Sequence, residues 1–298
     1  MAGPQNALSA PSTMAPEFAV CLTHDVDRPY KTYQWLYEAL AERDPRHLQR
    51  ALSGENPYWR FEELMAIEER LGVRSAFYFL NEPSLFGKSI RRWADPARWI
   101  EHLGRYDVAA PEMREVIDRL DRGGWEVGLH GSYDSARDGR RLRYEMSVLE
   151  GVLGHEVRGV RQHHLRLDPP ETWRIHAAMG LSYDTSLGSS TECGFSNGYR
   201  PIRPFDDGFL VFPLTIMEVG LPTDTTRAWE ECERLLEEAR ENDAVMTVLW
   251  HPRYLNDREF PGYRAIYERL VERAVEMGAW VGPPGECYDR LSIDAKMQ

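Results

Sequence analysis

Lysine and cysteine are both scarce in this 298-residue chain, and neither supplies a functional centre. Only three lysines (Lys31, Lys88 and Lys296) stand beside 33 arginines, a bias that we attribute to composition. The four cysteines are far apart and include no CxxC pair, which argues against a cysteine zinc cage. The net charge of −12 argues against a nucleic-acid or anionic-membrane surface.

Long apolar runs are also missing. No run approaches the roughly 18 residues that a membrane-spanning helix needs, so none is predicted. Residues 1–16 lack the basic start and apolar stretch of a signal peptide. We interpret them as a flexible leader before a single domain over residues 17–298. The expectation is a soluble, cytoplasmic protein, and its oligomeric state stays open.

Short apolar runs alternate with segments whose apolar residues recur at helical spacing, which predicts one α/β barrel of parallel strands. Two aromatic and charged stretches, 28–59 and 81–110, follow strand ends and are predicted to form a substrate lid or a subunit interface. The predicted strands are 18–22, 75–80, 125–129, 157–160, 210–219, 245–250 and, more weakly, 279–281. Helical patterns cover 60–71, 142–153, 229–239 and 263–274, and another begins at Pro111 and ends at Gly123.

The most informative stretch runs from Cys21 to Asp27, where an apolar strand ends in His24, Asp25 and Asp27. Alternate residues of a strand share a face, so Asp25 and Asp27 are expected to converge, whereas His24 is expected to be a buried, hydrogen-bonded histidine. Adjacent carboxylates require a cation or a shared proton between them. Other strand ends carry His130, Arg161, His163, His164, Asp184 and His251. Such ends form the active sites of barrels, so one shared site is predicted.

His130 and Asp134 are four residues apart, a spacing that places both side chains on one face of a helical turn. Together with Asp27 they would offer one imidazole and two carboxylates to a divalent ion. In an alternative interpretation, Asp134 caps a local turn or helix start. His163 or His164 would then be an unorthodox ligand or a substrate contact.

The order of these motifs resembles the polysaccharide deacetylase, or NodB-like, family over residues 17–290. The motifs are Thr-His-Asp25-Val-Asp27, His130-x-x-x-Asp134, Arg161, Asp184-Thr-Ser and Leu-Trp-His251. The resemblance implies a distorted (β/α) barrel with about seven parallel strands. It also implies a metal-dependent hydrolase that removes an acetyl or formyl group from an amino sugar or a related small amide.

The resemblance assigns roles residue by residue. Asp25 matches the catalytic base, while Asp27 and His130 match metal ligands. Asp134 stands where the family usually has a second histidine, a departure that favours harder ions than a two-histidine site would. The implied cofactor is a divalent ion, with zinc first and cobalt, nickel or iron as alternatives.

Three further roles follow from the same resemblance. Arg161 matches the arginine that holds the catalytic base, His251 the general acid, and Asp184 the aspartate that orients this histidine. The implied partner is a sugar or small-molecule substrate, without nucleic acid. Two alternatives remain: a cyclic amide or ureide hydrolase of the same fold, and a catalytically silent barrel that binds a glycan.

Overall fold

Nine strands form one sheet in the computed structural model, which describes residues 18–82, 99 and 102–297. The strand order is β6-β5-β4-β3-β2-β1-β8-β7, with β9 also paired to β1, and neighbouring strands run parallel. The strands are β1 (Ala19–Val26), β2 (Ala76–Leu80), β3 (Glu126–Gly131), β4 (Gly159–Gln162), β5 (Tyr183–Asp184), β6 (Leu210–Val211), β7 (Leu214–Met217), β8 (Val245–Leu249) and β9 (Trp280–Gly282).

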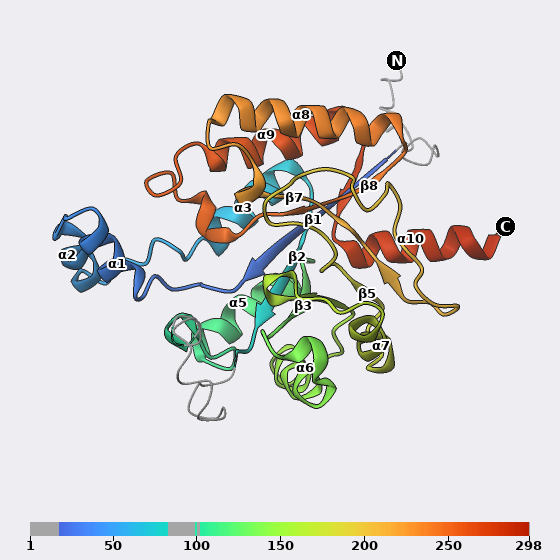
Figure 1. Ribbon diagram of the computed structural model, residues 1–298, viewed down its shortest axis with the longest axis horizontal. Helices are drawn as coiled ribbons and strands as arrows, with labels where there is room; N and C mark the ends of the chain where they lie inside the picture. Colours follow the sequence, from blue (N-terminus) through green and yellow to red (C-terminus); the bar gives the residue numbers. More distant parts are fainter. Residues whose placement is uncertain (1–17, 83–98, 100–101, 298) are drawn as a thin grey trace, which may run out of the picture.

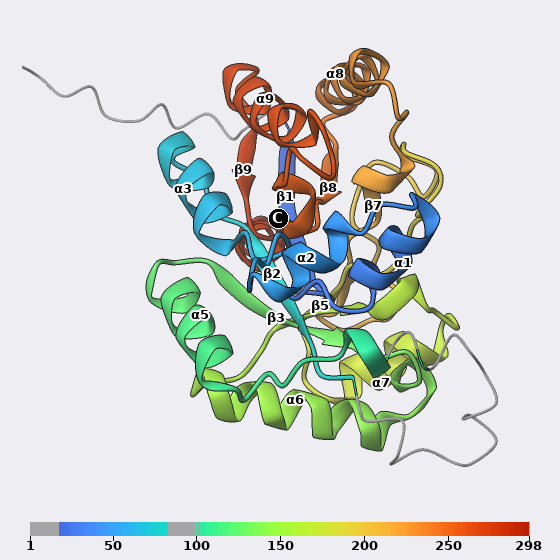
Figure 2. The same cartoon turned by 90° about the vertical axis from the view of Figure 1, so that its left-hand side faces the viewer.

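Helices surround this curled sheet, as Figure 1 shows, and the predicted α/β barrel is confirmed. Figure 2 looks toward the carboxyl ends of the strands, with α1 and α2 in front of them. The helices are α1 (Gln34–Ala41), α2 (Arg46–Leu52), α3 (Phe61–Leu71), α5 (Pro111–Arg122), α6 (Gly139–Leu153), α7 (Glu171–Ala178), α8 (Thr225–Glu241), α9 (Tyr263–Glu276) and α10 (Pro284–Met297).

The sheet has more strands than the roughly seven that the sequence predicted. The run 210–219, expected to be one strand, divides into β6, β7 and a 3₁₀ turn, Glu218–Gly220. Strand β5 has only two residues, which is too short for a periodicity to appear in the sequence. The path ends at β6 and β7, so within the described residues the barrel stays open between them.

Helix boundaries follow local signals. Pro111 begins α5 at a position where its missing N–H costs nothing, and α6 begins after Asp138, whose carboxylate accepts from the backbone N–H of Arg140 and Arg141. Helices α3 and α6 end at Gly72 and Gly154, both in the left-handed conformation that glycine adopts without strain.

The two faces of β1 have different neighbours. Val20 and Leu22 are fully buried in the main hydrophobic core between sheet and helices, whereas Cys21 belongs to a separate inner cluster with Tyr78 and Tyr183. Glycines make room for these inner tyrosines. A Cβ on Gly128 would lie 2.5 Å from Tyr78, and one on Gly159 would lie 2.1 Å from Tyr183. The barrel interior is therefore packed at its amino end, which leaves the carboxyl end for chemistry.

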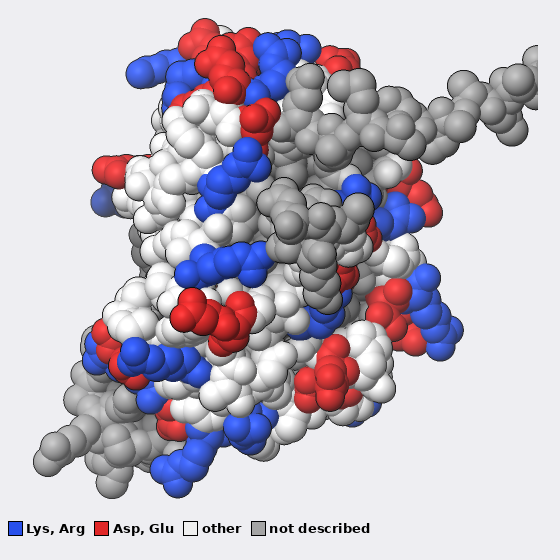
Figure 3. Space-filling view, turned by 90° about the vertical axis from the view of Figure 1, so that its right-hand side faces the viewer, with Lys and Arg blue, Asp and Glu red and all other residues white. Residues whose placement is uncertain are grey.

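The two predicted insertions differ in what the structure describes. Residues 28–59 contain α1 and α2, whereas most of 81–110, namely 83–98 and 100–101, lies outside the described residues. The predicted leader, 1–16, lies outside them as well. In the part of the chain that is described, no helix combines the length and apolarity that a bilayer crossing requires. On the face drawn in Figure 3, acidic and basic side chains are interspersed among uncharged ones.

Candidate active site

Strand alternation directs Asp25 and Asp27 to the inner face of β1, on the same side as Cys21. They are only 3% and 8% exposed, and both line a cavity of about 350 Å³ at the carboxyl end of the barrel. His24 points the other way. Its Nδ1 lies 2.6 Å from the Trp250 carbonyl oxygen and its Nε2 2.8 Å from Glu68, so the expected buried, hydrogen-bonded histidine is confirmed.

Asp25 is held by Arg161, as the resemblance implied. The Arg161 Nη1 donates to Asp25 Oδ1 at 3.0 Å and to Thr23 at 2.8 Å, and its Nε donates to the Thr185 carbonyl oxygen at 3.0 Å. Burial alone would raise the pKa of Asp25, but the charges of Arg161, His130 and His251 and the hydrogen bond from Arg161 together outweigh burial and lower that pKa below its ordinary value. Asp25 is therefore an ionised carboxylate in a nearly dry site.

His130 faces Asp25 from the end of β3. Its Nδ1 lies 2.9 Å from the Arg161 carbonyl oxygen, which only accepts, so Nδ1 carries the proton. The other nitrogen, Nε2, lies 3.8 Å from Asp25 Oδ2 and keeps a lone pair for the cavity. Burial lowers the pKa of His130, which favours this neutral form.

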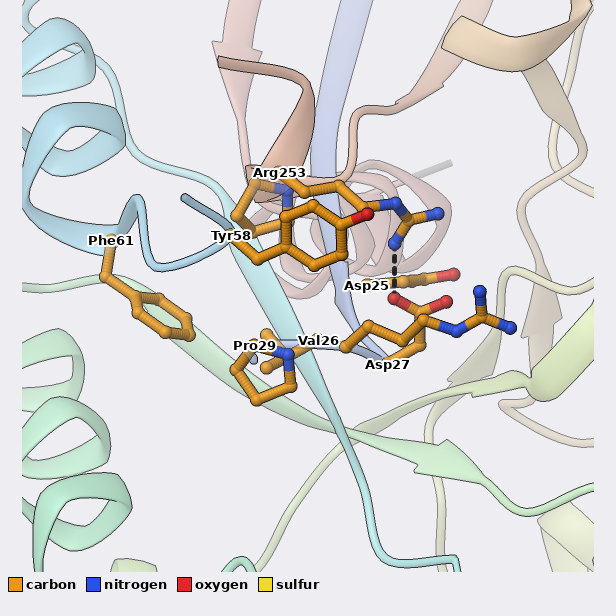
Figure 4. Close-up of a pocket in the computed structure, with 9 residues that line it drawn as sticks. Asp25, Val26, Asp27, Pro29, Tyr58, Phe61 and Arg253 are labelled. Carbon is orange, nitrogen blue, oxygen red and sulfur yellow. Dashed lines mark hydrogen bonds and ion pairs between the residues drawn. The ribbon is translucent and has the colours of Figure 1, made fainter. Parts of the chain in front are cut away.

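Asp27 has a partner that the sequence analysis missed. Arg253 Nη1 donates to Asp27 Oδ1 at 2.5 Å, a contact visible in Figure 4. Burial by itself would raise the pKa of Asp27. The positive charge of Arg253, and after it that of His251, acts in the opposite direction, and the pKa lies well below its usual range. The only signal was local: Arg253 follows His251 by two residues, in the 3₁₀ turn after β8.

His251 is oriented by Glu218 and not by Asp184, which corrects the expectation. Its Nδ1 lies 2.6 Å from Glu218 Oε1, and its backbone N–H donates to Glu218 Oε2 at 3.3 Å. Glu218 is fully buried in the turn after β7. A carboxylate accepts, so Nδ1 carries the proton and Nε2 is directed away from Glu218; it lies 3.9 Å from Asp27 Oδ2.

Asp184 instead organises the strand next to Arg161. Its Oδ1 accepts from the backbone N–H of Ser186 at 2.8 Å, and its Oδ2 accepts from the Ser186 hydroxyl at 2.6 Å. Oδ2 is also 3.2 Å from His176 Nδ1 on α7. The Asp184 carboxylate thus contacts Ser186 and His176, whereas His251 is bound by Glu218.

His163 and His164 close another side of the cavity. Their rings stack with centroids 4.0 Å apart, and the His163 ring meets His130 edge-on at 5.2 Å. His164 and Leu165 have φ values of 57° and 52°, a left-handed conformation that is strained for side chains of this size. Burial lowers the pKa of both histidines.

The cavity thus brings together residues from five strand ends, those of β1, β3, β4, β7 and β8, and Asp134 is not among them. Asp134 immediately precedes a short 3₁₀ turn, and its Oδ2 lies 3.7 Å from Arg141 Nη1. Met217, Leu165 and Val219 give the cavity an apolar wall. The full lining is Asp25, Asp27, Arg28, His130, His163, His164, Leu165, Ser190, Met217, Val219, His251 and Arg253.

The cavity contains side chains of the types that bind a divalent ion, but they are not arranged around a common metal position. Asp27, His130 and His163 would supply a carboxylate and two imidazoles, and His163 Nδ1 is buried without a hydrogen-bond partner. Yet no three His, Cys, Asp or Glu side chains within the described residues form a group that could hold a metal ion. In addition, the Arg253 guanidinium already takes the cation position beside Asp27.

Comparison with known proteins is informative at the level of structure. No family model and no curated protein matches the chain. A candidate polysaccharide deacetylase from Mycobacterium smegmatis has a TM-score of 0.62 at 18% identity, covering 98% of this chain and 96% of its own. Another, from Pseudomonas aeruginosa PAO1, has a TM-score of 0.59 at 15% identity, and the match covers 92% of this chain and 90% of the other. Puue allantoinase has a TM-score of 0.58 at 14% identity, with the same coverage of both chains. Identities this low show a common fold.

Proposed function

We propose that this chain, which shares the fold of polysaccharide deacetylases, is a hydrolase that cleaves the C–N bond of an N-acyl amide. One observation carries the proposal: two hydrogen-bonded pairs, Asp25–Arg161 and His251–Glu218, present a carboxylate and an imidazole to the same cavity. A fixed base and a fixed acid on one cavity are what hydrolysis of an unreactive amide requires.

In the proposed reaction, Asp25 takes a proton from a water molecule while the water oxygen attacks the amide carbon. Arg161 keeps Asp25 ionised before this step, and the partly buried guanidinium of Arg253 stabilises the negative charge that develops on the carbonyl oxygen. His251, protonated on both nitrogens, donates its Nε2 proton to the departing nitrogen as the C–N bond breaks. The products are a carboxylate and an amine.

The acyl donor is proposed to be an acetylated or formylated amino sugar. The apolar wall formed by Met217, Leu165 and Val219 suits an acyl methyl group or a sugar face, while the remaining lining is polar. A divalent ion on Asp27, His130 and His163 would polarise the carbonyl group if it displaced Arg253. Because the present arrangement does not fit an ion, no step is assigned to it.

A ring-opening hydrolase is the second candidate. The Arg253–Asp27 pair and the position of Asp134 outside the cavity both favour a reaction whose electrophilic help comes from an arginine. The similarity of fold to Puue allantoinase is consistent with that alternative. In a cyclic amide or ureide, Asp25 and His251 would have the same roles, and the leaving nitrogen would stay attached to the product.

A substrate panel tests both candidates. We expect the purified protein to hydrolyse N-acetyl or N-formyl amino sugars faster than cyclic ureides, and Asp25→Asn to lose at least about 10³-fold in kcat. Asp118→Asn, the same change at an exposed carboxylate of α5, is the control and should keep full activity. Hydrolysis of neither class, with a folded protein, would leave the binding-protein alternative.

A further inference from the structure

We infer that the substrate carries an anionic group, a carboxylate or a phosphate, and that Arg28 binds it. This inference rests on the proposed function, because it concerns the same cavity. Arg28 follows Asp27 directly and lines the cavity together with Asp25 and Asp27. It lines the same cavity as the proposed acid and base and belongs to neither of their hydrogen-bonded pairs.

Within the described part of the chain, Arg28 has no ion-pair partner. No carboxylate of the described residues lies within the 4.0 Å that defines an ion pair with Arg28. The contact of its guanidinium is with the face of Tyr33, 5.9 Å from the ring centroid. A ring face is a weak partner for a cation compared with a carboxylate, so Arg28 keeps its donors for a ligand.

The other charges that line the cavity cancel in pairs. Asp25 is paired with Arg161 and Asp27 with Arg253. The histidines that line the cavity add no negative charge in any protonation state. Glu218 is fully buried, hydrogen-bonded to His251, and is not part of the lining. Among the aspartates and arginines of the lining, Arg28 is therefore the one without an ion-pair partner within the described residues.

The availability of Arg28 does not depend on whether a divalent ion binds. An ion that displaced Arg253 from Asp27 would add positive charge to the cavity and leave Arg253 unpaired. In either state Arg28 presents the planar fork of N–H groups that pairs bidentately with a carboxylate or a phosphate. The apolar wall of Met217, Leu165 and Val219 would hold the organic part of the same ligand.

Three sugars without an acyl group test this without any turnover: glucose, glucuronate and glucose 6-phosphate. Their binding to the full-length protein is measured by calorimetry at fixed ionic strength. We expect at least one anionic sugar to bind ten times more tightly than glucose. Comparison of glucuronate with glucose 6-phosphate shows whether the site prefers a carboxylate or a phosphate. Arg28→Gln should reduce the preference to less than about threefold.

Two variants make the test specific. Arg28→Lys keeps the charge but loses the fork, so part of the preference should remain. Arg227→Gln, at an arginine of α8 that does not line the cavity, should keep all of it. An equal affinity for all three sugars in the wild type, no binding of any of them, or a preference unchanged by Arg28→Gln would overturn the inference.

The outcomes separate this inference from the proposed function. Amide hydrolysis without any anion preference would contradict the role of Arg28 and leave the hydrolase intact. An anion preference that depends on Arg28, in a protein that hydrolyses none of the amides tested, would support the anion site and contradict the proposed reaction.

Discussion

The Oε1 atom of Glu218 lies 2.6 Å from His251 Nδ1, and the two residues are 33 positions apart in the chain. They meet because β7 and β8 are parallel neighbours whose carboxyl ends lie side by side. The contact fixes which imidazole nitrogen faces the cavity, so the acid of the proposed reaction depends on a residue from another strand end.

Glu218→Gln should therefore lower kcat about 10²- to 10⁴-fold while KM changes little, because an amide at this position can favour the wrong tautomer of His251 and does not stabilise its positive charge. A loss in kcat at an unchanged KM and an unchanged free energy of unfolding distinguishes this positioning role from a merely structural one. Asp184→Asn, in contrast, should change kcat less than about threefold. A larger loss in Asp184→Asn than in Glu218→Gln would restore Asp184 as the orienting residue.

Arg253 is predicted to compete with metal ions for Asp27. Replacement by glutamine in Arg253→Gln frees the Asp27 carboxylate, so the affinity for Co²⁺ or Zn²⁺ should rise at least tenfold over that of the wild type. Elemental analysis and the visible absorption spectrum of bound Co²⁺ measure this. Stoichiometric metal in the wild-type protein, lost in Asp27→Ala, would show that an ion displaces Arg253. Loss of the metal in Asp134→Ala as well would support the prediction from the sequence that Asp134 is a metal ligand.

Glu145 should make stability depend on pH. It is buried beneath Ser132, whose hydroxyl and backbone N–H donate to it at 2.5 and 3.0 Å, and burial raises its pKa from 4.5 to about 7. The native state then binds this proton more tightly than the unfolded state does. Stability should be fullest below pH 4.5 and fall as the pH rises to about 7.

Comparison with Glu145→Gln isolates that effect. The free energy of unfolding of the wild type should decline relative to the variant by up to about 3 kcal/mol between pH 4.5 and 7. Denaturant unfolding at several pH values measures the difference. Glu237→Gln, at an exposed position of α8, should show no such trend. A constant difference between wild type and Glu145→Gln would contradict the raised pKa.

A buried carboxylate behind the active site is predicted to stabilise the fold. Glu68 of α3 is fully buried, and hydrogen bonds join it to four side chains: His24 at 2.8 Å, Ser75 at 2.8 Å, Trp125 at 2.6 Å and Tyr267 at 2.6 Å. Glu68→Gln replaces one accepting oxygen by a donor, which leaves buried donors facing a donor.

We expect this change to lower the free energy of unfolding by about 3 kcal/mol or more. Its exposed neighbour provides the matched control: Glu69→Gln should change it by less than about 0.5 kcal/mol. Urea unfolding of both variants is the measurement. Equal stabilities would show that the hydrogen bonds to Glu68 contribute little.

Sequence patterns were sufficient to predict features that depend on neighbouring residues within one strand or helix. The alternation of β1 by itself separated His24 from Asp25 and Asp27, since consecutive side chains of a strand must point to opposite faces. Helical periodicity located α3, α5, α6, α8 and α9, because each needs one apolar stripe to bury. The fold class followed from the order of these elements, and the structure confirms it.

The partners within the site depended on tertiary structure. The residues that neutralise Asp27 and orient His251 lie in short turns after β8 and β7, and their local sequence does not specify which side chain each of them pairs with. Asp134 has the right spacing from His130, but the turn that it precedes carries its carboxylate toward Arg141. Strand periodicity fixes a direction within one element, whereas the pairing of buried charges is decided by which strand ends the curled sheet brings within a few ångströms of one another.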